Sequence, residues 1–216
     1  MFYLFLNELK LNLSTISFTF FLFCLYIIII PLLIGFSQEV IYHYHLGIIW
    51  TCVLFCFLME RFYEPDLEDG TLCLYFLSSY TVEQIFLTKL LAYWSHKLLG
   101  ILCSVPILSI IYHFEISFVF YLTVMMGSFV LTLICGLYSL FTHAFKKEIS
   151  FGNTNNLQAF ATLPILIPLI IICASEQTDF SSETLGVFIV LITYISFFLC
   201  IYRVFVSITL HDIVSR

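Results

Sequence analysis

The stretch FTFFLFCLYIIIIPLLIGF, which begins at Phe18 and ends at Phe36, contains no charged side chain. A helix needs about 20 mainly apolar residues to cross the hydrocarbon core of a bilayer, and this run is long enough. The whole chain fits the same environment, because 62% of its residues are hydrophobic and 10% are charged, against about 45–50% and about 25% in soluble domains. We therefore predict a membrane protein rather than a water-soluble domain.

Further apolar runs follow along the chain. We expect six spans, near residues 15–37, 40–60, 85–112, 116–143, 157–175 and 185–206. The runs are continuous rather than alternating, and lipid cannot satisfy exposed backbone groups, so helices are expected and barrel strands are not. The predicted fold is all-α: a single polytopic domain over residues 1–216 with about six transmembrane helices. Pro164 and Pro168 make the fifth span the least regular. The first run exceeds the roughly 7–15 apolar residues of a secretory signal, so we expect it to stay as an anchor.

The basic residues indicate an orientation. They lie in the N-terminal segment, beside the second and fourth loops and near the C-terminus, and they are Lys10, Arg61, Lys89, Lys146, Lys147, Arg203 and Arg216. The loops around residues 37–40, 113–115 and 175–183 contain acids but no Lys or Arg. By the positive-inside rule, both termini and the loop at residues 61–84 face the cytoplasm or the mitochondrial matrix.

Lys97 is the exception, since it falls a few turns inside the third run. Two interpretations are open. The side chain either extends toward the inner interface or pairs inside the bundle, and we favour the first.

The eight cysteines lie almost entirely in apolar runs, without a CxxC pair or metal-ligand spacing. We interpret them as small packing residues. Cys52 and Cys56 share a helix face through their four-residue spacing, so a redox or metal role there is the alternative. The acids are spread along the chain and form no charged block, so no nucleic-acid partner is expected.

The most informative segment is the acidic loop at residues 60–72, between the second and third spans. It is too charged to lie in lipid. Pro65 suits an early helical position, and the acids after it suit the positive end of a short helix. We predict an amphipathic coupling helix on the inner surface, within a loop at residues 61–84. The candidate coupling residues are Glu60, Arg61, Asp66, Glu68, Asp69 and Gly70.

An acidic surface helix has two interpretations. It is either a solvated element that only maintains orientation, or a docking site for the basic groove of a soluble partner, because anionic lipids repel it. After it, the sequence from Thr81 to Gln84 has the pattern of a capping box, which predicts the start of the next helix.

In its motifs the chain resembles the CcmB family, the permease subunit of the ABC complex for cytochrome c maturation, and its mitochondrial members in particular. The motifs cover most of the chain. They are HLGIIW at residues 45–50, MERF at 59–62, EDGTL at 68–72, Lys89 with Trp94, Gly127 with Ser128, LTL at 131–133, Gly136, and Leu163 with Pro164 and Pro168. Cys73 and Tyr93 depart from an acid and a histidine that bacterial relatives tend to have.

The resemblance implies a non-catalytic permease subunit that forms a homodimer and docks a CcmA-like ATPase through the inner loop. Its other implied partners are a CcmC-like haem-handling membrane protein and a CcmE-like haem chaperone, whose release ATP hydrolysis would drive. The sequence contains no G-x-x-x-x-G-K-[ST] motif, so ATP would be used by the partner subunit. We expect no cofactor bound directly, with haem as a transient ligand.

The alternative function is a haem-ligating electron-transfer subunit. Of the six histidines, only His96 lies inside a span, so no pair is available at mid-membrane. His43 and His45, with Trp50, form a candidate outer, haem-facing edge. A polar interfacial edge beside neighbouring tyrosines is the favoured interpretation of that pair, and a haem-ligand role is the alternative.

Composition and resemblance together favour the mitochondrial inner membrane, with a bacterial inner membrane as the alternative.

Overall fold

The computed structural model describes residues 5–6, 8–9, 13–34, 38–58, 80–112, 117–146, 154–175 and 182–214. These residues form six long helices and no strand, so the all-α prediction is confirmed for the described chain. The helices are α2 (Leu13–Ile34), α3 (Gln38–Leu58), α6 (Val82–Tyr112), α7 (Phe118–Lys146), α8 (Thr154–Ala174) and α9 (Ser182–Val214).

Each helix overlaps one of the six apolar runs, and the differences lie at the ends. The last helix extends to Val214 rather than to about residue 206, and α3 ends at Leu58. Helix α8 contains both Pro164 and Pro168 and is still described as one helix. The predicted coupling helix at residues 60–72 lies outside the described residues.

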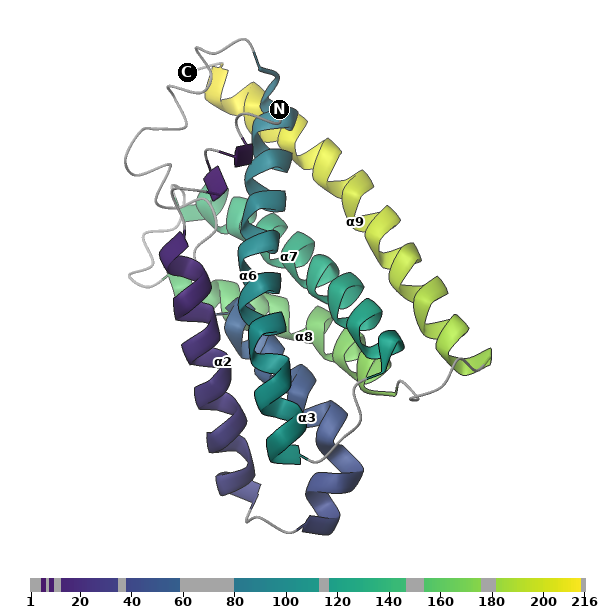
Figure 1. Cartoon of the computed structure of the whole chain (residues 1–216). Coiled ribbons are helices and arrows are strands. Elements are labelled where there is room, and N and C mark those ends of the chain that lie inside the picture. The colour runs from purple at the N-terminus through teal and green to yellow at the C-terminus, as the bar shows by residue number, and fades with distance from the viewer. Residues whose placement is uncertain are drawn as a thin grey trace.

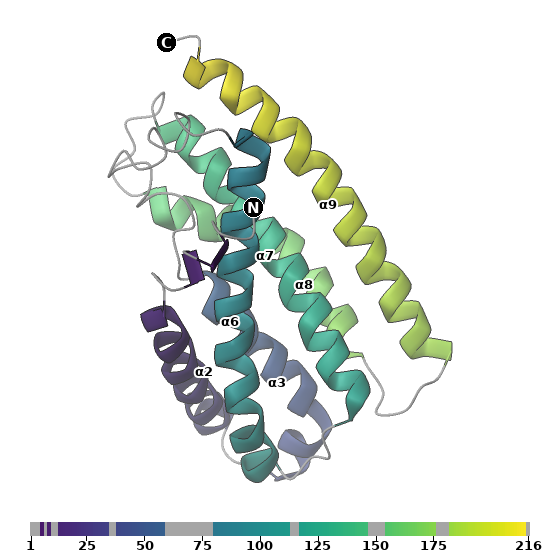
Figure 2. The same cartoon turned by 45° about the horizontal axis from the view of Figure 1, so that its top comes forward.

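Helix α7 is the centre of the bundle. It packs against α6, α8, α9 and α3, while α2 packs against α6 and α3 on the other side. Helix α9 runs obliquely along α7, away from α2 and α3, and its end at Val214 lies at the same end of the bundle as the start of α6 (Figures 1 and 2).

Three described helices are long and apolar enough to cross a bilayer, with candidate spans at Glu83–Tyr112, Phe118–Ser139 and Thr184–Val204. The other three contain shorter apolar stretches, Thr15–Ile30, His45–Leu58 and Thr162–Ala174. The chain is therefore a polytopic helical membrane protein. That all six helices cross the membrane remains a prediction.

A proline in α2 is compensated by a tyrosine from α6. Pro31 has no N–H, so the carbonyl of Ile27, four residues earlier, loses its donor within the helix. The Tyr112 hydroxyl donates to this carbonyl oxygen at 3.0 Å, in a buried position. In lipid, water cannot replace a lost donor. A donor from a neighbouring helix therefore allows a transmembrane helix to contain a proline.

Helices α2 and α6 approach closely at Gly100. A Cβ atom built on Gly100 would lie 2.9 Å from Thr19 Cβ and 3.0 Å from the carbonyl oxygen of Ile16. Small residues are common where membrane helices pack because they allow such approach. The Thr19 hydroxyl donates to the Thr15 carbonyl within its own helix, which leaves an apolar surface toward α6.

Candidate functional site

The first part of α6 is the described helical segment that follows the acidic loop in the sequence. We call residues 82–97 the α6 anchor. Its start follows the predicted capping box: Gln84 Oε1 accepts from the Thr81 backbone N–H at 3.2 Å. The Ile85 N–H donates to the Thr81 carbonyl at 3.1 Å, which makes Thr81 the N-cap residue. The helix start predicted from sequence is therefore confirmed.

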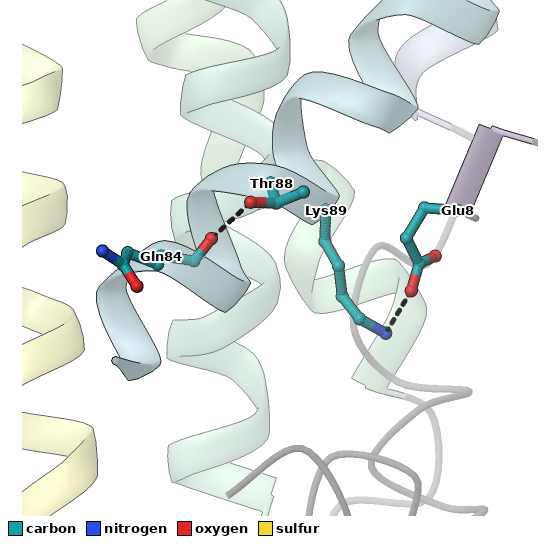
Figure 3. A network of polar contacts seen from close by, with 4 residues as sticks. All are labelled: Glu8, Gln84, Thr88 and Lys89. Carbon is teal, nitrogen blue, oxygen red and sulfur yellow. Dashed lines mark hydrogen bonds and ion pairs between the residues drawn. The ribbon is translucent and has the colours of Figure 1, made fainter. Parts of the chain in front are cut away.

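An ion pair connects the α6 anchor to the N-terminal segment. Lys89 Nζ lies 3.7 Å from Glu8 Oε1, and the two side chains are only 7% and 10% exposed. Figure 3 shows the two side chains pointing toward each other, one turn beyond the Gln84 carbonyl that accepts from Thr88 Oγ1 at 2.6 Å. Charges this deeply buried are stable only when paired, so this contact fixes the N-terminal segment on α6.

A second contact joins the same two elements two turns further along α6. His96 is buried, with Nε2 2.9 Å from the Leu9 carbonyl oxygen and Nδ1 2.6 Å from the Ala92 carbonyl oxygen. A neutral imidazole has one N–H and donates to one of these carbonyls, whereas the doubly protonated ring donates to both. Both ring nitrogens face backbone carbonyls, so neither is directed toward a haem iron.

Lys97 lies inside the bundle, and the expectation that it extends toward the interface is wrong. The residue is 0% exposed, and Nζ donates to the Cys56 carbonyl oxygen at 3.2 Å. Nζ also lies 5.6 Å from the centre of the Tyr93 ring. Cys56 is in the last turn of α3, where the carbonyls carry partial negative charge, so a cation is favourable there. Lys97 therefore joins α3, which leads into the acidic loop, to α6, which follows it.

The two tryptophans of the chain contact one dipeptide of α7. A Cβ on Gly127 would lie 2.9 Å from Trp50 Cζ3, closer still to Cη2, and 3.2 Å from Cys173 Sγ. Trp94 Nε1 donates to Ser128 Oγ at 3.1 Å. Helices α3, α6 and α8 thus meet α7 at residues 127–128.

The structure describes two of the three side chains of the predicted outer edge, His45 and Trp50. His45 is partly buried, and the side chain of His43 lies outside the described residues. Trp50 is 0% exposed and packs on Gly127, so it belongs to the core and not to an exposed haem-facing edge. The cause is its depth, since it lies two turns along α3 from His43 and Gly127 leaves room for its ring. Its Nε1 has no hydrogen-bond partner among the described atoms, so packing alone holds the ring.

The candidate coupling residues, Glu60, Arg61, Asp66, Glu68, Asp69 and Gly70, all lie outside the described residues. Cys52 and Cys56 are fully buried in α3, as expected of packing residues. The described residues contain no group of three or more His, Cys, Asp or Glu side chains that could hold a metal ion.

No local pattern in the sequence indicated that Glu8 and Leu9 contact α6. The contact of Tyr112 could have been anticipated in part, because Pro31 leaves the Ile27 carbonyl without a donor inside the helix.

Comparison with known proteins gives a consistent result over the whole chain. The CcmB protein family matches residues 1–208. A putative cytochrome c biogenesis ccmB-like mitochondrial protein of Marchantia polymorpha is 43% identical over 213 residues, which cover 99% of this chain and 74% of that protein. The protein of the same description from Arabidopsis thaliana is 38% identical over 199 residues, or 92% and 93% of the two chains. Heme exporter protein B of Pseudomonas aeruginosa is 25% identical over 154 residues, or 69% and 66%. With this match across nearly its full length, the chain belongs to the CcmB family.

Proposed function

We propose that this protein is the membrane-spanning subunit of an ABC-type complex for cytochrome c biogenesis. In this proposal a CcmA-like ATPase docks on the acidic loop, and its hydrolysis of ATP is coupled to haem delivery by release of a CcmE-like haem chaperone. A CcmC-like haem-handling protein and a second copy of the chain complete the complex. The family match over residues 1–208 carries the proposal.

The charge and position of the acidic loop support a docking role. It has five acids and one arginine between residues 60 and 72, and its acidic face would be repelled by anionic lipid headgroups and attracted to a basic groove. The helices on either side are tied together, since Lys97 of α6 donates to the Cys56 carbonyl in the last turn of α3. A force applied to the loop would therefore reach both helices.

We propose that the protein is a transport component and not an enzyme. The sequence contains no P-loop, so ATP would be bound and hydrolysed by the partner. Two relatives are named heme exporter protein B, which supports haem as a transient ligand rather than a bound cofactor.

The names of the plant relatives support a mitochondrial location. We propose a multi-pass protein of the inner membrane with both termini and the acidic loop on the matrix side, following the distribution of basic residues.

His43 and His45 remain a candidate outer edge. We propose that they form a polar interfacial edge, with haem contact as the alternative. Replacing His45 with Ala should leave cytochrome c levels unchanged. A loss of cytochrome c with normal amounts of the variant protein would instead favour haem contact.

Charge reversal in the acidic loop tests the docking role. We expect the double variant Asp66→Lys, Asp69→Lys to lose the ATPase when the complex is purified from membranes. The matched control is the double variant Glu176→Lys, Asp179→Lys, which also reverses two charges, in a loop predicted on the opposite side, and should retain the ATPase. Unchanged co-purification with the double variant at Asp66 and Asp69 would contradict docking at this loop.

A further inference from the structure

We propose that residues 8 and 9 form a strap that positions the α6 anchor, and that Glu8, Lys89 and His96 are positioning residues for coupling to the ATPase. The inference rests on the proposed function, because it assigns the strap a task at the same loop. It means that the position of α6 depends on the N-terminal residues 8 and 9 as well as on the loop.

The strap contacts one face of α6 at two levels. Glu8 pairs with Lys89, and the Leu9 carbonyl lies against His96 Nε2. Lys89 and His96 are seven residues apart, which is close to two helical turns, so both side chains project from the same face. The two residues of the strap therefore contact α6 at two points along its axis. Together these contacts oppose both rotation and displacement of the helix.

Burial distinguishes this ion pair from the surface pair between Glu83 of α6 and Arg203 of α9. The side chains of Lys89 and Glu8 are 7% and 10% exposed, whereas those of Arg203 and Glu83 are 80% and 44% exposed at a separation of 3.8 Å. Exposed pairs are screened by solvent and contribute little. Water does not compensate a buried charge that is separated from its partner, so the strap contact holds its geometry more strongly.

The strap and the two helices that flank the loop meet at one turn of α6. His96 faces the N-terminal segment, and the next residue, Lys97, donates to the last turn of α3. A displacement that enters α6 through its start at Val82 therefore acts against the strap at Lys89 and His96, in addition to the exposed Glu83–Arg203 pair with α9 and the buried side chain of Phe86. The strap is the part of this resistance that comes from a buried ion pair, and we expect it to limit how far the anchor moves when the loop is displaced.

A charge-swap cycle tests the strap in the complete complex, reconstituted with the P-loop ATPase. The variants are Glu8→Lys, Lys89→Glu, and the double variant with both changes. Arg203→Glu is the matched control, since it reverses a charge in the exposed pair. Two quantities are measured for each variant: the amount of ATPase retained on purification and the rate of ATP hydrolysis by the retained enzyme.

We expect each single reversal to retain the ATPase but to change its hydrolysis rate at least about fivefold, the lower end of typical coupling between sites. The double swap should restore the rate to within about twofold of the wild type, because the opposite charges are again paired. Arg203→Glu should match the wild type. Single reversals with wild-type rates, or a double swap no better than the singles, would overturn the strap.

A second measurement covers the case in which a reversal prevents folding. The milder change Glu8→Gln keeps the shape of the side chain and removes its charge. The purified chain alone should melt at a lower temperature with Glu8→Gln than without it, and Lys89→Gln should then add little further loss. Full additivity of the two losses would overturn the strap without involving the ATPase. Failure of the wild-type chain to retain any ATPase would instead overturn the proposed function, so the two failures are distinguishable.

Discussion

The contact between Gly127 and Trp50 predicts a large effect from a single methyl group. In Gly127→Ala, the new Cβ would lie 2.9 Å from Trp50 Cζ3 and closer to Cη2. Unstrained carbon atoms lie about 3.5–4.0 Å apart, so the ring has to move by more than about half an ångström. Trp50 is fully buried and Cys173 Sγ would lie 3.2 Å from the same Cβ, so the movement has to displace other buried atoms.

The expected magnitude follows from two opposing terms. Overpacking a dense core costs about 1–3 kcal/mol, and the blocked ring places this site near the upper end. Alanine in place of glycine within a helix contributes about 0.5–1 kcal/mol in the other direction. We expect a net destabilisation of about 2 kcal/mol, which corresponds to a fall in melting temperature of about 4–8 °C for a domain of this size.

The assay is thermal unfolding of the purified chain in detergent, followed by tryptophan fluorescence, because both tryptophans contact residues 127–128. Gly186→Ala is the control, since a Cβ there meets nothing within 4 Å. Trp50→Phe, which shortens the ring, should make Gly127→Ala less harmful in the double variant. If Gly127→Ala melted at or above the temperature of Gly186→Ala, the close packing of α3 on α7 would be refuted.

Three further predictions concern the helix contacts. Tyr112→Phe removes the donor to the Ile27 carbonyl and should destabilise the chain by about 0.5–2 kcal/mol in thermal unfolding. The loss should be smaller in a Pro31→Ala background, because alanine restores an N–H within α2. An equal loss in that background would contradict the compensation. Gly100→Ala should destabilise by about 1–2 kcal/mol, because its Cβ would lie 3.0 Å or less from α2, whereas Gly47→Ala, with nothing within 4 Å, should not. Lys97 should resist a water-soluble amine reagent in the native protein and react after unfolding, as measured by mass spectrometry; native reactivity would favour an interfacial position.

The helices could be predicted because apolar length is a local property of the sequence. Each described helix overlaps an apolar run, and the start of α6 agrees with the capping pattern at Thr81 and Gln84. The family motifs could be recognised in the same way. The motifs lie far apart in the sequence, so they did not indicate that Trp50 contacts Gly127 and that Trp94 contacts Ser128.

Two predictions from the sequence were wrong, and both concern where a side chain lies within the bundle. The polar side chains of α6 are not gathered on one face of the helix, so the sequence does not show which face is turned toward the bundle, and the direction of Lys97 could not be derived from it. Trp50 was placed at an outer edge because it follows His43 and His45 closely, although two turns of helix carry it into the core. The pairing of Glu8 with Lys89 joins distant parts of the chain, and no local spacing rule applies to such pairs.

In the proposed function, the acidic loop faces a water-soluble ATPase on the same side of the membrane as both chain ends. The most direct measurement is site-specific photocrosslinking in native membranes from position 68, with position 179 as the comparison. We predict that a crosslinker at Glu68 captures a P-loop ATPase and that one at Asp179 does not. Capture from position 179 with none from position 68 would place the loop on the wrong side and contradict the proposed function.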